Sequence, residues 1–257
     1  MKVSYQTIMI RIERSRHYMK SLIDLHTHTI ASGHAYNTVL EMIRAAAEKQ
    51  LPILGISDHA PAMRGTPDEV YFWNFKAVPR TFEGVRILFG CELNIIDYKG
   101  TIDLSEKALK RLDYAIASLH DLCLPFGTKE ENTAAVLGVM ENPYVKIIGH
   151  PDDGRYPLDL EAVVRAAKTH GKLLEINNSS LLPNSSRKNA KENDLILLEH
   201  CRHYEVPVLM GSDAHFVNAV GNHELAVSVI REAGFPEDLV ANTSLDLLAK
   251  YIPAVRD

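Results

Sequence analysis

The sequence contains little cysteine and no long apolar run, and both absences exclude a class of protein. Its three cysteines, Cys91, Cys123 and Cys201, lie far apart and form no C-x-x-C pair. This pattern is typical of reduced thiols and not of a disulfide framework, so we expect a cytoplasmic protein. No apolar run approaches the roughly 18 residues that a membrane span needs. We therefore expect no membrane partner.

An excess of positive charge is also missing. The formal net charge is -5 and the sequence pI is about 6.2. A protein that coats nucleic acid through bulk charge would be basic, so this class is disfavoured, although a local basic groove is not excluded. The composition is otherwise that of a globular protein, and it is compatible with a homo-oligomer.

Internal repeats, low-complexity tracts and a clear domain boundary are absent from the sequence as well. Residues 21–257 are expected to form one domain, because α/β barrels of this length are usually single domains. Residues 1–20 contain Arg11, Arg14 and Arg16 but no apolar core of the kind found in secretory signals. We predict a short N-terminal extension, or a start codon assigned too early, before a domain that begins near Met19.

Short apolar segments alternate with helical patterns along residues 21–257. Parallel strands joined by helical crossovers produce such alternation. Because we count seven strands and not eight, we predict a distorted (β/α)7 barrel in preference to a doubly wound sheet. The first predicted strand begins at residue 21. The other six cover 52–57, 85–93, 114–118, 145–149, 173–177 and 206–211.

The helices are predicted from their caps and apolar stripes. Asn37 or Thr38 can cap a helix that runs to about Gln50 and buries Leu40, Ile43, Ala46 and Ala47. One further helix is predicted to begin at residue 105, and another is predicted to end at about residue 204. Others are predicted over 129–141, over 159–170 with Gly171 as its C-cap, and over 222–234. We predict a loop with one helical turn at 60–80, a loop at 178–189, a hairpin over 94–103 that turns near 99–100, and an outer covering made by 235–257.

The chemical signal begins at Asp24-Leu25-His26-Thr27-His28, at the end of the first strand. Residues two apart on a strand point to the same side, so His26 and His28 would lie together. Two imidazoles on one face can bind a metal ion. Asp24 shares this face and is predicted to support them from deeper in the barrel.

Further histidines and acidic residues follow the other predicted strands. The candidate metal ligands are His26, His28, His34, His59, Glu92, His120, His150, Asp213 and His215. They would converge at the carboxyl ends of the strands, where barrel enzymes build their sites. Nine ligands exceed the four that satisfy one Zn²⁺ ion, so two or three ions are expected. Imidazole and carboxylate ligands without thiolate favour zinc, manganese or iron over magnesium or calcium.

Other polar residues are expected in supporting or surface positions. Glu175 and Asn177 share a face of the sixth strand, where Glu175 could support the site or be a buried core acid. Arg155 and Arg187 lie in loops at the same mouth, and a guanidinium group fits phosphate oxygens, so they are the candidate substrate-binding residues. The remaining histidines are expected on the surface: His17, His170, His200, His203 and His223.

With these motifs the chain resembles the PHP family, named for polymerase and histidinol phosphatase, from Ile23 to its last helix. The motifs are Asp24-Leu25-His26-Thr27-His28, Ser57-Asp58-His59, Gly90-Cys91-Glu92, Ser118-Leu119-His120, Gly149-His150-Pro151 and Gly211-Ser212-Asp213-Ala214-His215. The stretches Phe89 to Ile95 and Leu174 to Ser180 are similar to the YcdX-like phosphatase branch.

This resemblance implies a distorted (β/α)7 barrel with a trinuclear site. The first ion would be bound by His26, His28, Glu92 and Asp213, the second by Glu92, His120 and His150, and the third by His34, His59 and His215. Glu92 would bridge the first two ions, and Glu92 and Asp213 are the candidate catalytic residues. Zinc is the expected metal, in up to three copies, with manganese and iron as alternatives.

The predicted reaction is hydrolysis of a phosphomonoester, with a phosphorylated small molecule as substrate. Clustered divalent ions ionise a shared water and neutralise phosphate charge, so a bridging hydroxide can attack without a protein nucleophile. Three alternatives stay open: a PHP-type nuclease that acts on phosphodiesters, an amidohydrolase, and a metal-binding protein without enzymatic activity. Only the nuclease would have nucleic acid as partner. The amidohydrolase is disfavoured because Glu92 stands where that class carries a modified lysine.

Overall fold

The strands form two sheets in a computed structural model that describes residues 19–256. The four-stranded sheet has the order β1-β2-β4-β3, and all of its pairs are parallel except β3 with β4. Its strands are β1 (Ile23–Asp24), β2 (Ile53–Ile56), β3 (Thr81–Phe82) and β4 (Val85–Phe89). The five-stranded sheet is parallel throughout, in the order β5-β6-β7-β8-β9. Its strands are β5 (Glu92–Asn94), β6 (Ala115–Ser118), β7 (Val145–Ile148), β8 (Leu173–Asn177) and β9 (Val208–Gly211).

Isolated parallel bridges connect the two sheets at two places. One bridge pairs Thr27, after β1, with Ala214, after β9, and the other pairs His59, after β2, with Glu92 at the start of β5. The two sheets are therefore joined where β1 and β9 end, and where the end of β2 meets the start of β5. The predicted α/β fold with parallel strands is confirmed.

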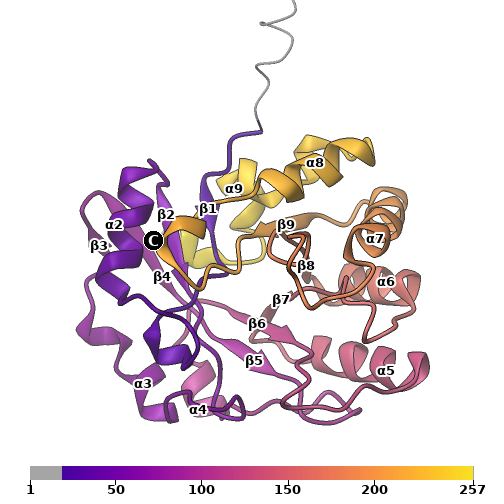
Figure 1. Cartoon of the computed structure of the whole chain (residues 1–257), viewed down its shortest axis with the longest axis horizontal. Coiled ribbons are helices and arrows are strands. Elements are labelled where there is room, and N and C mark those ends of the chain that lie inside the picture. Colours follow the sequence, from indigo (N-terminus) through magenta and orange to yellow (C-terminus); the bar gives the residue numbers. More distant parts are fainter. Residues whose placement is uncertain (1–18, 257) are drawn as a thin grey trace, which may run out of the picture.

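Helices surround the strands on the outside (Figure 1). The longer helices are α2 (Val39–Glu48), α5 (Lys129–Met140), α6 (Leu160–His170), α7 (Ala190–Tyr204) and α8 (Glu224–Glu232), and the short ones are α3 (Glu69–Trp73), α4 (Glu106–Leu109) and α9 (Leu245–Leu248). None of the helices formed by residues 19–256 combines the length and the apolar character that a membrane span requires.

The first residues of helix α2 agree with the sequence prediction, whereas its buried face differs from the predicted one. Thr38 and Glu41 form a capping box, in which each side chain accepts a hydrogen bond from the other residue's backbone N–H, so the predicted start is confirmed. The buried stripe contains Met42 and Ala45 in addition to the predicted Ile43 and Ala46, whereas Leu40 is exposed. The stripe is thus rotated from the predicted one.

The predicted third strand, residues 85–93, is divided at Gly90-Cys91 into β4 and β5. The buried ring of Tyr114 packs against Gly90, and its hydroxyl donates a hydrogen bond to the Leu25 carbonyl at 2.6 Å. Before the division the chain pairs with β2, and after it the chain pairs with β6. The division turns Glu92 into the region between the sheets.

Replacing Gly90 with alanine should destabilise the protein. A Cβ atom there would lie 2.5 Å from Tyr114 Cζ, and the Tyr114 ring is buried with its hydroxyl bonded to the Leu25 carbonyl. Overpacking of this kind costs about 1–3 kcal/mol in unfolding free energy, which urea denaturation would measure. Gly90→Ala should cost less unfolding free energy in a Tyr114→Leu background than in the wild-type protein, because leucine is smaller than tyrosine. Equal costs in the two backgrounds would contradict the clash.

The predicted outer covering by residues 235–257 is wrong for the described part of that segment. Leu248, Ile252 and Val255 pack into a buried cluster with strand side chains such as Leu25 and Leu209. Their apolar side chains fill space against the strands, which removes more surface from water than an outer position would.

One residue of this segment connects the first and last strands. The Asn242 side chain accepts a hydrogen bond from Met210 N at 2.6 Å and donates to Met210 O at 2.9 Å and Ile23 O at 3.1 Å. Its amide thus supplies bonds that a neighbouring strand would otherwise make, and it joins β9 to β1.

Candidate metal centre

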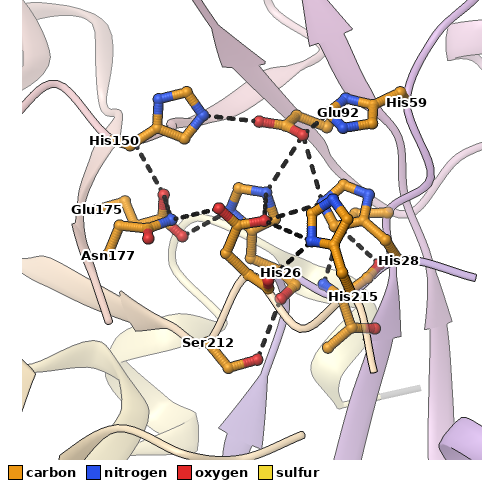
Figure 2. Close-up of polar contacts among 12 residues, drawn as sticks. His26, His28, His59, Glu92, His150, Glu175, Asn177, Ser212 and His215 are labelled. Atoms are coloured by element: carbon orange, nitrogen blue, oxygen red, sulfur yellow. Dashed lines mark hydrogen bonds and ion pairs between the residues drawn. The ribbon is translucent and has the colours of Figure 1, made fainter. Parts of the chain in front are cut away.

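Glu92 lies at the centre of the predicted ligands, between two groups of imidazoles (Figure 2). Its Oε1 atom is 3.2 Å from His120 Nε2 and 3.0 Å from His150 Nε2. Its Oε2 atom is 3.3 Å from His26 Nε2, 3.4 Å from His28 Nε2 and 2.9 Å from His59 Nδ1. The two oxygens of one carboxylate therefore face different sets of imidazoles.

Asp213 approaches the same centre from the end of β9. Its Oδ1 atom is 3.2 Å from His28 Nε2 and 3.6 Å from His26 Nε2. Asp213 and His150 both have a positive φ, 54° and 30°, which is unfavourable for residues other than glycine. Such strain persists where the surrounding structure enforces it, and it is typical of functional sites.

The remaining predicted ligands form the more open side of the centre. The ring of His34 lies 5.0 Å from that of His59 and 4.8 Å from that of His215, measured between centroids. His59 also takes part in two other potential ligand groups, one with Glu92 and His120 and one with His28 and His215. All nine predicted ligands thus lie together, while their assignment to individual ions stays a prediction.

Several buried polar atoms at the centre lack a hydrogen-bond partner within residues 19–256. These atoms are His26 Nε2, His28 Nε2, His59 Nδ1 and Glu92 Oε2. Leaving such atoms unpaired costs free energy, and a cation among them would satisfy their lone pairs. The site therefore fits a metal ion, and its imidazole and carboxylate composition fits zinc, manganese or iron.

The pKa values of these groups are consistent with cation binding. Burial raises the pKa of Glu92, but the charges of His26, His59 and His120 outweigh burial and hold it well below the usual value. Burial lowers the pKa of His26, but the carboxylates of Glu175, Glu92 and Asp213 raise it well above the usual value. The carboxylates thus stay charged, and a bound cation would take the place of the proton on His26.

Glu175 supports the centre from β8. Its Oε1 atom is 2.6 Å from His26 Nδ1, and its Oε2 atom accepts hydrogen bonds from His150 N at 2.8 Å and Asn177 Nδ2 at 3.0 Å. A carboxylate on the second ring nitrogen fixes the orientation of a ligating histidine. Of the two positions considered for Glu175, the supporting one is the one observed.

Two further supporting residues were missed. Asn94 Oδ1 lies 2.7 Å from His120 Nδ1, and Ser32 Oγ lies 3.1 Å from His28 Nδ1. Asn94 could have been found because it shares a strand face with Glu92 two residues earlier. Ser32 ends a three-residue 3-10 helix, Ile30–Ser32, which is too short to show a periodic signal. Ser32 in turn donates to Asp58 Oδ1 at 2.6 Å. Asp58 therefore holds the loop after β1.

The two candidate arginines have different surroundings. Arg155 is 23% exposed and bound by Asp153, at 2.7 Å from Nη2 to Oδ2, and by Asp121, at 3.0 Å from Nη1 to Oδ2. Arg187 is 15% exposed, and both of its Nη atoms donate to Asp213 Oδ2 at 3.1 Å. Only Arg187 thus contacts a predicted ligand.

The prediction that His223 lies on the surface is wrong. It is 5% exposed and its Nε2 atom lies 3.6 Å from Asp24 Oδ1. The chain turns back after β9, and Gly221 N donates to Asp24 Oδ2 at 2.7 Å, which draws His223 inward. His170 and His203 are exposed as predicted, His200 is half-buried, and His17 lies outside the described residues.

Two buried carboxyl groups lie near the centre without hydrogen bonds from residues 19–256. They are Asp152, after β7, and Asp194, on α7. Burial raises the pKa of Asp152 to about 6, and burial together with the charges of Asp152 and Glu175 raises the pKa of Asp194 well above its usual value. A raised pKa means that the folded state binds the proton more tightly than the unfolded state does. Protonation of these carboxyl groups therefore stabilises the folded protein.

Replacing Asp194 with asparagine should stabilise the protein at neutral pH. The protonated carboxyl makes its full contribution to the free energy of unfolding below the unfolded-state pKa of about 3.9. This contribution falls as the pH rises toward the folded-state pKa. Urea denaturation of metal-free protein should show Asp194→Asn more stable at pH 8, by on the order of 1–3 kcal/mol, with a smaller advantage at pH 4. Asp238→Asn, at an exposed position, is the control. An advantage independent of pH would contradict the explanation.

The sequence is similar to those of known proteins. A model of the PHP domain matches residues 24–179. A "probable phosphatase" of Caldicellulosiruptor bescii is 45% identical over 90% of this chain and 95% of its own length, and one of Thermoanaerobacter sp. is 47% identical over 91% and 95%.

Solved structures share the fold at lower identity. Histidinol phosphate phosphatase from Lactococcus lactis, complexed with zinc, L-histidinol and phosphate, has a TM-score of 0.55 at 17% identity, covering 83% of this chain and 94% of its own. A chain in the cryo-EM structure of archaeal ribonuclease P with mature tRNA has a TM-score of 0.58 at 18% identity, covering 91% of this chain and 93% of its own.

Proposed function

The chain belongs to the PHP domain family, and on that premise we propose that it hydrolyses phosphomonoesters of small molecules at a trinuclear metal centre. That it is a metal-dependent hydrolase follows from this membership and from relatives named probable phosphatases. The observation that carries the finer proposal is the position of Glu92, whose two oxygens face separate groups of imidazoles. One carboxylate in that position can serve two ions.

Zinc is the proposed metal, with manganese and iron as alternatives. The histidinol phosphate phosphatase of Lactococcus lactis, which shares the fold, was solved with zinc. The first ion would be held by His26, His28, Glu92 and Asp213, the second by Glu92, His120 and His150, and the third by His34, His59 and His215. Such ions lower the pKa of a bound water and neutralise phosphate charge.

The protein's own residues orient this centre and receive the substrate. Arg187 holds Asp213 through Oδ2, which leaves Oδ1 directed at His26 and His28. The guanidinium of Arg187 also supplies positive charge beside the ligands, where a phosphate oxygen can accept from it. Arg155, bound by two carboxylates, is the weaker of the two candidate phosphate contacts.

We also propose that the two sheets close into a distorted (β/α)7 barrel formed by residues 21–257. β4 and β5 would count as one interrupted strand, which gives seven parallel segments. The bridges between residues 27 and 214 and between 59 and 92 support closure. The convergence of ligands from six of these segments is what the mouth of a barrel provides.

Metal removal and a substrate panel test the proposed function. Protein stripped by a chelator should lose activity and recover it with zinc or manganese, and metal-replete protein should contain more than one ion per chain. It should hydrolyse phosphomonoesters fastest at neutral to alkaline pH. Faster hydrolysis of bis-p-nitrophenyl phosphate or single-stranded DNA would favour the nuclease, and activity confined to lactones or hydantoins would favour the amidohydrolase.

A further inference from the structure

Large apolar side chains are exposed in loops that follow the carboxyl ends of four strands, three of which also lead into predicted metal ligands. They follow β1, β6, β8 and β9, and we call them the apolar rim: Ile30, Tyr36, Leu122, Phe126, Leu182 and Phe216. Their exposed fractions range from 40% for Leu182 to 73% for Tyr36. A contiguous apolar patch beside polar residues marks a surface that another molecule covers. Among these six residues, Tyr36 and Phe216 lie on loops that hydrogen bonds join directly.

Tyr36 and Phe216 lie on neighbouring loops. Tyr36 N donates to His215 O at 3.1 Å, and Val217 N donates to Asn37 Oδ1 at 3.0 Å. These bonds join the loop after β1 to the loop after β9, immediately beside His215. The two aromatic side chains are therefore held by ordered backbone next to the metal centre, and they stay 73% and 50% exposed.

A second part of the rim follows β6, beside His120. Leu122 is 58% exposed and Phe126 is 51% exposed. The Phe126 ring is fixed from below by Tyr156, at 4.8 Å between centroids, and by the Arg155 guanidinium at 5.4 Å. Apolar surface thus accompanies the ligands of this side as well.

We propose that the apolar rim, with Tyr36 and Phe216 as its principal contacts, binds an apolar or aromatic organic group of the phosphoester. This inference rests on the proposed function, because the metal centre would fix the phosphate and leave the organic group at the mouth. Small-molecule sites combine a few polar groups that orient the ligand with apolar and aromatic side chains that bury the rest. An aromatic ring can stack on Tyr36 and Phe216, whereas a polyhydroxylated group gains little there.

The test compares phenyl phosphate with glycerol 2-phosphate in matched variants. Wild-type protein should have the higher kcat/KM for phenyl phosphate. Phe216→Ser should lower that kcat/KM by about five- to tenfold, mainly through KM, because stacked aromatic pairs contribute about that factor. Hydrolysis of glycerol 2-phosphate and metal content should stay near wild type. Tyr36→Ser should behave in the same way, and Phe216→Leu should recover part of the loss.

Phe82→Ser is the matched control, because Phe82 is 38% exposed on β3 and its replacement should change neither substrate. Equal losses for both substrates in Phe216→Ser and Tyr36→Ser, or no loss for either, would overturn the inference. A change in oligomeric state with unchanged selectivity would assign the rim to a second copy of the chain and would also overturn it. If the wild-type protein hydrolyses no phosphomonoester, it is the proposed function that fails.

Discussion

Replacing Glu92 with alanine should abolish turnover and release both ions that it is proposed to bridge. Its Oε1 atom faces His120 and His150, and its Oε2 atom faces His26, His28 and His59. No other predicted ligand contacts both groups in this way within residues 19–256. Removing it would leave two ions close together with less compensating charge. Metal content by elemental analysis and kcat on a phosphomonoester would measure the effect.

His59→Ala is the comparison for this variant. His59 would contribute one ring nitrogen to the proposed centre, so its loss should disturb one ion and leave the pair at Glu92 partly assembled. Loss of a single charge-stabilising contact typically costs roughly 10²–10³ in rate, and measurable turnover should remain. Both variants should first be shown to be folded by circular dichroism. A Glu92→Ala protein with its full metal content and near wild-type turnover would show that Glu92 is not the bridge.

Replacing Arg187 with methionine should reduce kcat/KM by roughly 10²–10³, the cost of losing one preorganised charged contact. Two effects combine: Asp213 Oδ2 loses both of its guanidinium donors, and the phosphate loses a positive charge beside the ligands. Methionine keeps much of the side-chain length, so the buried space stays filled. The measurement is kcat/KM together with inhibition by inorganic phosphate, which should weaken.

Arg155→Met is the matched control for Arg187→Met. Arg155 is bound by Asp153 and Asp121 at the edge of the mouth. Because these two carboxylates already occupy its guanidinium group, this variant should lose less than about tenfold in kcat/KM, which corresponds to about 1.4 kcal/mol in activation free energy. If Arg155→Met has the larger effect, and phosphate inhibition is unchanged in Arg187→Met, then Arg155 and not Arg187 is the phosphate contact.

The strand ends could be predicted from the sequence because two local signals coincide there. Each parallel strand is a short apolar run, and its first polar residues mark where it leaves the core. His59, His120 and His150 each follow such a run directly, so their convergence required only the rule that parallel strands end on one side. The capping box at Thr38 and the C-cap at Gly171, with φ 61°, are local signals of the same kind.

What could not be predicted depends on contacts between distant residues. Where residues 85–93 divide, Gly90 packs against the ring of Tyr114, which the sequence predicts on another strand. His223 is buried because Gly221 bonds to Asp24, nearly two hundred residues earlier. The support of His28 by Ser32 depends on Asp58, which anchors the intervening loop. None of these pairings has a period or a motif that a single sequence displays.

The amide of Asn242 has a consequence for the order in which the protein can mature. The proposed metal centre would use His26 and His28 from the start of the domain and Asp213 from near its end. The hydrogen bonds of Asn242 join the strands that precede these residues. When only the first two hundred residues have been translated, most of the histidines are present, but Asp213 and Asn242 are not. Contacts so distant in sequence form late because the loop between them must first be closed. The enzyme should therefore acquire its full set of ions after translation has passed Asn242, and a nascent chain should hold them only weakly.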